Sequence, residues 1–162
     1  MTIYEDTGQK IGQHDNIKQY LDAHGIKLTR VKLDTGDYCA PPRIAVDTKK
    51  GLSEVYQDLV GDHDRFHREY ARAKEDGIKL YFLIEDVNGD GIRDVSDVHT
   101  WVNPAKRRGA NRPSAALQKQ METVSERYGV EWVFCHPCET GRVLCELLGI
   151  EVRDGNRMDQ TT

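Results

Sequence analysis

The chain has 162 residues, 38% of them hydrophobic and 31% charged, which is the size and composition of one globular domain with its own core. Its 27 acidic and 23 basic residues give a net charge of −4, which argues against indiscriminate binding to nucleic acid, because such binding depends on Lys and Arg contacts to phosphates. No apolar run has the length of a membrane-spanning helix and the first residues lack a signal-peptide pattern, so we expect no membrane partner and a cytoplasmic location.

The hydrophobic pattern alternates between the period of a strand and that of a helix, which predicts a mixed α/β domain. We expect strands at residues 2–5, 27–33, 43–49, 79–85 and 130–135. We expect helices at residues 16–24, 52–60, 96–102, 114–128 and 139–148, and a further helical segment that ends near residue 75. Asp15 and Ser114 are expected to cap two of these helices. Residues 1–153 are expected to form the domain, and residues 154–162 a polar tail.

One predicted strand and the turn before it carry the residues best suited to chemistry. Asp37 follows a glycine turn, and the alternation of residues 43–49 places Asp47 and Lys49 on the same face of a strand. Two carboxylates can hold a divalent cation through hard oxygen ligands, and a neighbouring lysine can orient or activate a metal-bound water. An acid–any–lysine triplet also arises by chance as a surface salt bridge on an edge strand. The pattern alone therefore leaves two interpretations, a phosphodiester-cleaving site and an exposed ion pair.

The wider sequence favours the first interpretation. Residues 33–38 and 47–49 resemble the L-x-x-G-D-Y and E-R-K motifs of the XPF-type structure-specific endonuclease domain, a branch of the PD-(D/E)XK nucleases. Further stretches resemble other parts of that domain in the same order, at residues 3–7, 53–59, 65–69, 80–85 and 139–144. The chain departs from the family where E-R-K reads Asp47-Thr48-Lys49 and where D-x-R-E reads as residues 6–9. No tandem helix-hairpin-helix domain is recognisable after the nuclease-like region.

The resemblance implies a restriction-endonuclease-like three-layer fold, in which helices flank a mixed central sheet. It also implies a DNA endonuclease that depends on Mg²⁺ or Mn²⁺ and acts on branched or flapped DNA in repair, recombination or replication, in a bacterium or bacteriophage. Asp37, Asp47 and Lys49 would be catalytic. The metal ligands would be Asp37, Asp47 and the backbone carbonyl of Thr48, with Asp6 and Glu54 as further candidates.

DNA would be bound by positive side chains around this site. Arg65 lies where the family has an arginine near its active site, and Arg68 lies one turn further along the same expected helix. The remaining candidates follow the predicted strand or lie in a basic loop: Lys50, Lys106, Arg107 and Arg108.

Residues 86–97 form a second candidate cation site. Asp86, Asn88, Asp90, Asp94 and Asp97 occupy liganding positions of a calcium loop and resemble the loop of dockerins. A strand precedes this loop where a calcium-binding hand requires a helix, so a structural Ca²⁺ site competes with an ordinary Asp/Asn/Gly turn that caps the next helix.

Two other functions stay open. A DNA-binding or protein-interaction module with weak or no catalysis would explain the altered motifs, and a calcium-dependent adhesion module would use the loop. Relatives pair through this domain, so a homodimer is an open alternative as well.

Cys135, Cys138 and Cys145 could bind zinc, but their positions on a strand and a helix favour small buried side chains.

Overall fold

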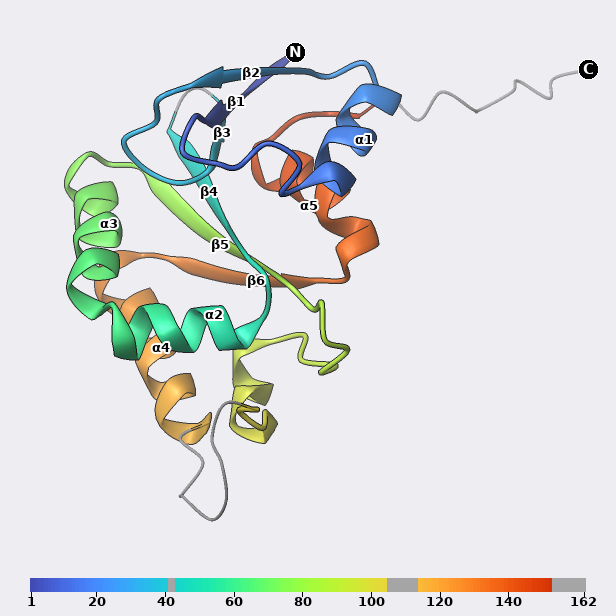
Figure 1. The fold of residues 1–162 in the computed structure, drawn as a ribbon. Helices are drawn as coiled ribbons and strands as arrows, with labels where there is room; N and C mark the ends of the chain where they lie inside the picture. Colours follow the sequence, from blue (N-terminus) through green and yellow to red (C-terminus); the bar gives the residue numbers. More distant parts are fainter. Residues whose placement is uncertain (41–42, 105–113, 153–162) are drawn as a thin grey trace, which may run out of the picture.

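The computed structural model describes residues 1–40, 43–104 and 114–152 and is built on one six-stranded sheet (Figure 1). The strand order is β2 (Lys27–Val31), β1 (Thr2–Asp6), β3 (Tyr38–Ala40), β4 (Ile44–Lys49), β5 (Lys79–Glu85) and β6 (Glu131–Cys135). β3 runs antiparallel to both of its neighbours, whereas the pairs β1–β2, β4–β5 and β5–β6 are parallel. The predicted mixed sheet is confirmed.

Helices cover both faces of the sheet, which makes the fold three-layered (Figure 1). On one face lie α1 (Asp15–Ala23) and α5 (Thr140–Leu147). On the other face lie α2 (Leu52–Tyr56), α3 (His63–Glu75) and α4 (Ser114–Tyr128). Each face has its own hydrophobic core. The predicted α/β class and layer arrangement are therefore confirmed.

The alternation of side chains along the central strands builds these two cores. On β5, Phe82 belongs to the core under α3 and α4, and Leu83 belongs to the core under α1 and α5. The Phe82 ring lies 4.8 Å from the ring of Phe66 on α3 and 4.7 Å from that of Trp132 on β6. A strand buried on both faces reads as continuously apolar, which is why its central place was predictable.

Several local expectations differ from the structure. The strand β3 was not predicted, because three residues are too few to show a period. Asp15 is the first residue of α1 and not its cap, since His14 precedes the helix. Ser114, expected to cap a helix, is the first residue of α4, and its side chain donates a hydrogen bond to the carbonyl of Trp101. The helix expected at residues 52–60 is α2 followed by a π-helical turn at Gln57–Gly61.

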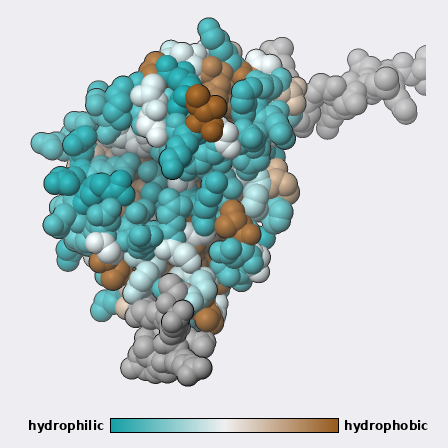
Figure 2. Space-filling view, in the orientation of Figure 1, coloured by the Kyte–Doolittle hydropathy of each residue, from teal (hydrophilic) through white to brown (hydrophobic). Residues whose placement is uncertain are grey.

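Hydrophilic side chains cover most of the face shown in Figure 2, and the hydrophobic spots on it are small and separated. Within residues 1–40, 43–104 and 114–152, no helix is both long and apolar enough to cross a membrane. The expected tail at residues 154–162 and most of the expected basic loop lie outside the described residues.

Candidate active site

β4 delivers two of the three predicted catalytic side chains to one place. Asp47 and Lys49 alternate with Thr48, so both point to the face covered by α2 and α3. The Lys49 Nζ lies 2.8 Å from Asp47 Oδ1, and the two side chains are 9% and 8% exposed. The predicted strand and its alternation are confirmed, and the alternative of an exposed salt bridge on an edge strand is wrong, because β4 is central and this pair is buried.

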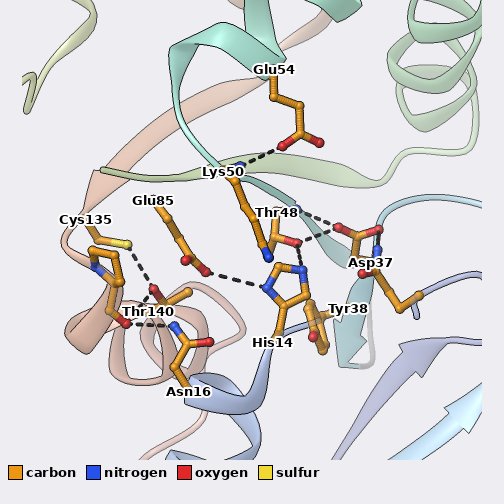
Figure 3. A network of polar contacts seen from close by, with 12 residues as sticks. His14, Asn16, Asp37, Tyr38, Thr48, Lys50, Glu54, Glu85, Cys135 and Thr140 are labelled. Carbon is orange, nitrogen blue, oxygen red and sulfur yellow. Dashed lines mark hydrogen bonds and ion pairs between the residues drawn. The ribbon is translucent and has the colours of Figure 1, made fainter. Parts of the chain in front are cut away.

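Asp37 reaches the same place from the turn before β3. Gly36 has a φ of 72°, and a Cβ there would lie 3.1 Å from the carbonyl oxygen of Val46. Glycine is therefore required for the turn to pack against β4. The Asp37 amide donates to that same Val46 carbonyl at 2.9 Å. Its Oδ2 accepts hydrogen bonds from the Thr48 amide at 2.8 Å and the Thr48 hydroxyl at 2.7 Å (Figure 3), and Gln9 donates to Oδ1.

These side chains line a cavity of about 200 Å³, which we call the acidic cavity. Five carboxylates face it, those of Asp37, Asp47, Glu54, Asp58 and Glu69. Two cationic side chains, Lys49 and Arg65, face it as well. The excess of carboxylates over cations in a small, partly buried space favours the binding of a further positive charge.

Burial and neighbouring charges perturb the two central groups. Burial raises the pKa of the Asp47 carboxyl well above its usual value, and the charge of Asp37 raises it further, against the opposing charge of Lys49. Burial alone would lower the pKa of the Lys49 ammonium, but Asp47 and Asp58 outweigh this effect and raise it. Lys49 is therefore a firmly protonated cation held between two carboxylates. That state suits a group that positions water or phosphate better than one that removes a proton.

Asp58 was missed by sequence reasoning. Its Oδ2 lies 2.8 Å from the Lys49 Nζ, and its Oδ1 lies 3.8 Å from an Arg65 nitrogen. The π-helical turn after α2 carries Asp58, and such turns occur often at functional sites. A signal was present in the sequence, because Asp58 comes three residues after Val55 and so falls on the predicted inward face of the helix.

The residues of the acidic cavity fit a hard divalent cation. Asp47 Oδ1 and Asp58 Oδ2 are buried, and each lies 2.8 Å from the Lys49 ammonium, which is its only close polar contact among the described residues. Among the residues that the structure describes, no three Asp, Glu, His or Cys side chains are arranged to hold a metal by themselves. A cation here would thus depend on few protein ligands and keep several sites for water and phosphate, as Mg²⁺ does in enzymes that cut or transfer phosphates.

An outer groove of about 410 Å³ adjoins the acidic cavity and shares Asp37 and Asp47 with it. Four cationic side chains line this groove, Lys32, Arg65, Arg68 and Arg72, together with five carboxylates, those of Asp6, Asp34, Asp37, Asp47 and Glu69. The structure therefore brings two of the predicted DNA-binding residues, Arg65 and Arg68, next to the predicted catalytic ones.

Solved structures with the same fold were found by comparison. Two structures of XPF from Aeropyrum pernix, one of them in complex with DNA, match with a TM-score of 0.65 at 18% sequence identity. The match covers 91% of this chain and 63% of the XPF chain. This protein has the fold of these XPF chains. The fold expectation drawn from the sequence motifs is thereby confirmed, although no family model and no curated protein matches the sequence.

Other predicted residues occupy different places on this XPF-like fold. Asp6 lines the outer groove and not the acidic cavity, and its Oδ1 accepts from the Leu33 amide at 2.8 Å and contacts Lys32 at 3.1 Å. Burial would raise its pKa, but these contacts outweigh that effect and lower it. Asp6 is thus engaged in holding the chain between β2 and β3, which weakens its case as a metal ligand.

The side chains of Glu54 and Lys50 line different hollows. Glu54 lines the acidic cavity, and one of its oxygens accepts from the Lys50 amide at 2.7 Å (Figure 3). The Lys50 side chain lines a different hollow, together with Asn16 and His136 on the α1 side of the sheet. The Lys50 side chain therefore does not line the acidic cavity, although Lys50 follows Lys49 in the sequence. Lys106, Arg107 and Arg108 lie outside the described residues.

The expected calcium loop is not assembled as a cation site. Both Asp86 oxygens accept backbone hydrogen bonds, from the amides of Asp90 at 2.7 Å and Gly91 at 2.9 Å. Asp94 caps the following 3₁₀ helix (Val95–Thr100) by accepting from the Ser96 amide at 2.8 Å. Within the described residues Asp86, Asp90, Asp94 and Asp97 form no metal-binding group, and Asn88 carries an amide instead of a carboxylate. The motif behaves as an Asp/Gly turn, because β5 and not a helix leads into it.

The cysteines form no zinc site among the described residues. Cys135 and Cys145 are buried and Cys138 is exposed, all as free thiols. Burial raises the pKa of Cys135 and of Cys145 to about 11, which favours the neutral thiol in the metal-free protein.

Proposed function

We propose that this protein is a metal-dependent DNA endonuclease that hydrolyses phosphodiester bonds. The observation that carries the proposal is the convergence of Asp37, Asp47 and Lys49 on one acidic cavity that opens into a groove lined by four cationic side chains. The XPF fold, seen in a related structure with DNA, supports DNA as the substrate class.

Each group has a distinct task in this proposal. Asp37, Asp47 and the backbone carbonyl of Thr48 hold Mg²⁺ or Mn²⁺, which when bound supplies polarisation of the phosphate and a more acidic water. Lys49, kept in place by Asp58, donates hydrogen bonds to the attacking water or to a phosphate oxygen and neutralises the charge that develops there. Arg65 and Arg68 bind neighbouring phosphates and so place the scissile bond over the cavity.

The finer points rest on analogy with the fold. Branched or flapped DNA as substrate, a 5′-phosphate and a 3′-hydroxyl as products, and a role in repair, recombination or replication in a bacterium or bacteriophage are proposals of this kind. A homodimer belongs with them. The chain spans 63% of the XPF chains that it matches, so properties of the whole XPF protein do not transfer directly.

The test is cleavage of end-labelled flap, fork, single-stranded and duplex DNA in Mg²⁺, Mn²⁺ or EDTA. The proposal predicts metal-dependent cleavage that Asp47→Asn and Lys49→Met each reduce by at least about 100-fold, because both groups act on the transition state. Asp64→Asn is the matched control, since Asp64 lies on α3 with a fully exposed carboxylate. Cleavage that survives in both site variants would come from a contaminant and would contradict the proposal.

The second candidate is a DNA-binding module without catalysis. Two observations favour it: Lys49 is locked between Asp47 and Asp58, and no three-carboxylate metal group is present among the described residues. It predicts DNA binding that Arg65→Ala weakens, with no cleavage of any of the four substrates. The same set of assays therefore separates the two functions.

A further inference from the structure

A chain of buried polar side chains leads from the predicted metal ligand Asp37 to the opposite side of the sheet (Figure 3). The Thr48 hydroxyl lies 2.7 Å from Asp37 Oδ2 and 3.2 Å from His14 Nε2. The other ring nitrogen, His14 Nδ1, lies 3.6 Å from Glu85 Oε1. Thr48, His14 and Glu85 are 6%, 7% and 4% exposed. A chain of this kind in the interior is costly unless its hydrogen bonds are made in a defined direction.

The direction follows from counting protons. A threonine hydroxyl has one proton to donate, and an ionised carboxylate such as Asp37 can only accept. The Thr48 proton must therefore point to Asp37, which leaves the hydroxyl oxygen as the acceptor of a hydrogen bond from His14. It follows that His14 carries a proton on Nε2 and donates it to Thr48.

The His14 ring is held from several sides. His14 directly precedes α1, its Nδ1 faces Glu85 at the end of β5, and its edge packs against the Tyr38 ring with the centroids 6.3 Å apart at 74°. Glu85 Oε1 and His14 Nδ1 make no hydrogen bond, so the start of α1 and the Tyr38 ring fix the imidazole. A ring held in this way can fix the hydroxyl that it contacts, because a threonine side chain has only a few staggered rotamers to choose from.

We propose that His14 is a positioning residue of the acidic cavity. By donating from Nε2, it keeps the Thr48 hydroxyl aimed at Asp37 Oδ2, and the two hydrogen bonds from Thr48 then fix the Asp37 carboxylate in the orientation that a cation requires. His14 itself touches neither the cavity nor the substrate. This proposal rests on the proposed function for its consequence, since partners behind a metal ligand tune its affinity.

The first test measures Mn²⁺ binding to the free protein by electron paramagnetic resonance, without DNA. His14→Leu, which removes the N–H donor, is expected to weaken binding by about 10-fold. His14→Gln, whose side-chain amide can place an N–H near the position of Nε2, is expected to stay within about 2-fold of the wild type. Wild-type binding by His14→Leu would overturn the proposal, and so would a Gln variant as weak as the Leu variant.

A double variant separates positioning from general structural damage. Thr48→Val removes the hydroxyl at nearly constant shape and is expected to weaken Mn²⁺ binding about as much as His14→Leu. If His14 acts through Thr48, the double variant loses no more than either single variant. Losses that multiply would show two independent effects and would overturn the proposal.

Nuclear magnetic resonance gives a readout that needs neither metal nor activity. In the wild type, the His14 ring should show its proton on Nε2; a ring with a bare Nε2 would overturn the proposal even if no variant folds. In His14→Leu, hydrogen exchange of the Thr48 amide should speed up by about 10-fold while amides of β5 keep their rates. If the wild type binds no Mn²⁺ but these two results hold, the proposed metal-dependent function fails and the positioning role of His14 stands.

Discussion

Removing the charge of Lys49 should destabilise the protein in a pH-dependent way. Lys49→Met keeps most of the volume of the side chain and its contacts with the core, but it leaves Asp47 and Asp58 without their shared cation. Each ion pair spans 2.8 Å. At an effective dielectric constant of about 20, each is worth roughly 6 kcal/mol before desolvation is counted. After desolvation, breaking a buried pair by removing one partner costs roughly 3–5 kcal/mol.

The loss should depend on pH through Asp47, because Asp58 still has Arg65 at 3.8 Å. Burial already raises the pKa of Asp47 above its usual 3.8, and without Lys49 it rises further. Between 3.8 and the raised value, the folded variant binds more protons than the unfolded chain, so its stability falls as pH rises. We therefore expect a loss of roughly 3–5 kcal/mol at pH 8 and a smaller loss at pH 5.

The assay is urea unfolding followed by the fluorescence of the buried Trp101 and Trp132. Lys50→Met is the matched control, because Lys50 is adjacent in sequence, exposed and on the other side of the sheet; it should change stability by less than about 0.5 kcal/mol at either pH. Equal stability of the two variants at pH 8, or a Lys49→Met loss that grows toward pH 5, would refute the description of Lys49 as a buried cation between two carboxylates.

Further expectations concern the groove, the turn and the loop. Arg65→Ala should weaken DNA binding in EDTA and reduce the slope of affinity against salt by about one counterion; an unchanged slope would remove Arg65 from the phosphate contacts. Gly36→Ala should destabilise the fold more than Gly89→Ala does, by about 1–2 kcal/mol. Both glycines have positive φ, but only the Cβ at Gly36 would approach the Val46 carbonyl closely, so equal losses in thermal melts would contradict the described packing. Millimolar Ca²⁺ should leave the melting temperatures of the wild type and of Asp86→Ala unchanged. A rise in the melting temperature of the wild type that is absent in Asp86→Ala would instead support a calcium site in the loop.

Local sequence patterns predicted the central part of the site. The alternation on β4 placed Asp47 and Lys49 on one face, and the glycine turn placed Asp37 near them. These predictions succeeded because they depend on the two-residue period of a strand and on the backbone freedom of glycine, both of which act within a few residues.

Contacts between distant segments were not predictable in the same way. The helical period placed Asp58 on an inward face but did not show that it pairs with Lys49, and Lys32 joins the outer groove from the chain that follows β2. His14 meets Thr48 across 34 residues of sequence. The loop at residues 86–97 has a matching string of ligand types, but such a string does not by itself fix the converging backbone that a cation needs, and the calcium site stays a prediction.

The central claim is that Asp37 and Asp47 together hold the cation on which the proposed cleavage depends. Crystals grown with Mn²⁺ and a short DNA, measured at the manganese absorption edge, test this directly. We predict an anomalous peak about 2.0–2.3 Å from carboxylate oxygens of both Asp37 and Asp47. The claim would be contradicted by well-ordered DNA with no anomalous peak at these carboxylates, or by an anomalous peak that appears only at another place in the protein.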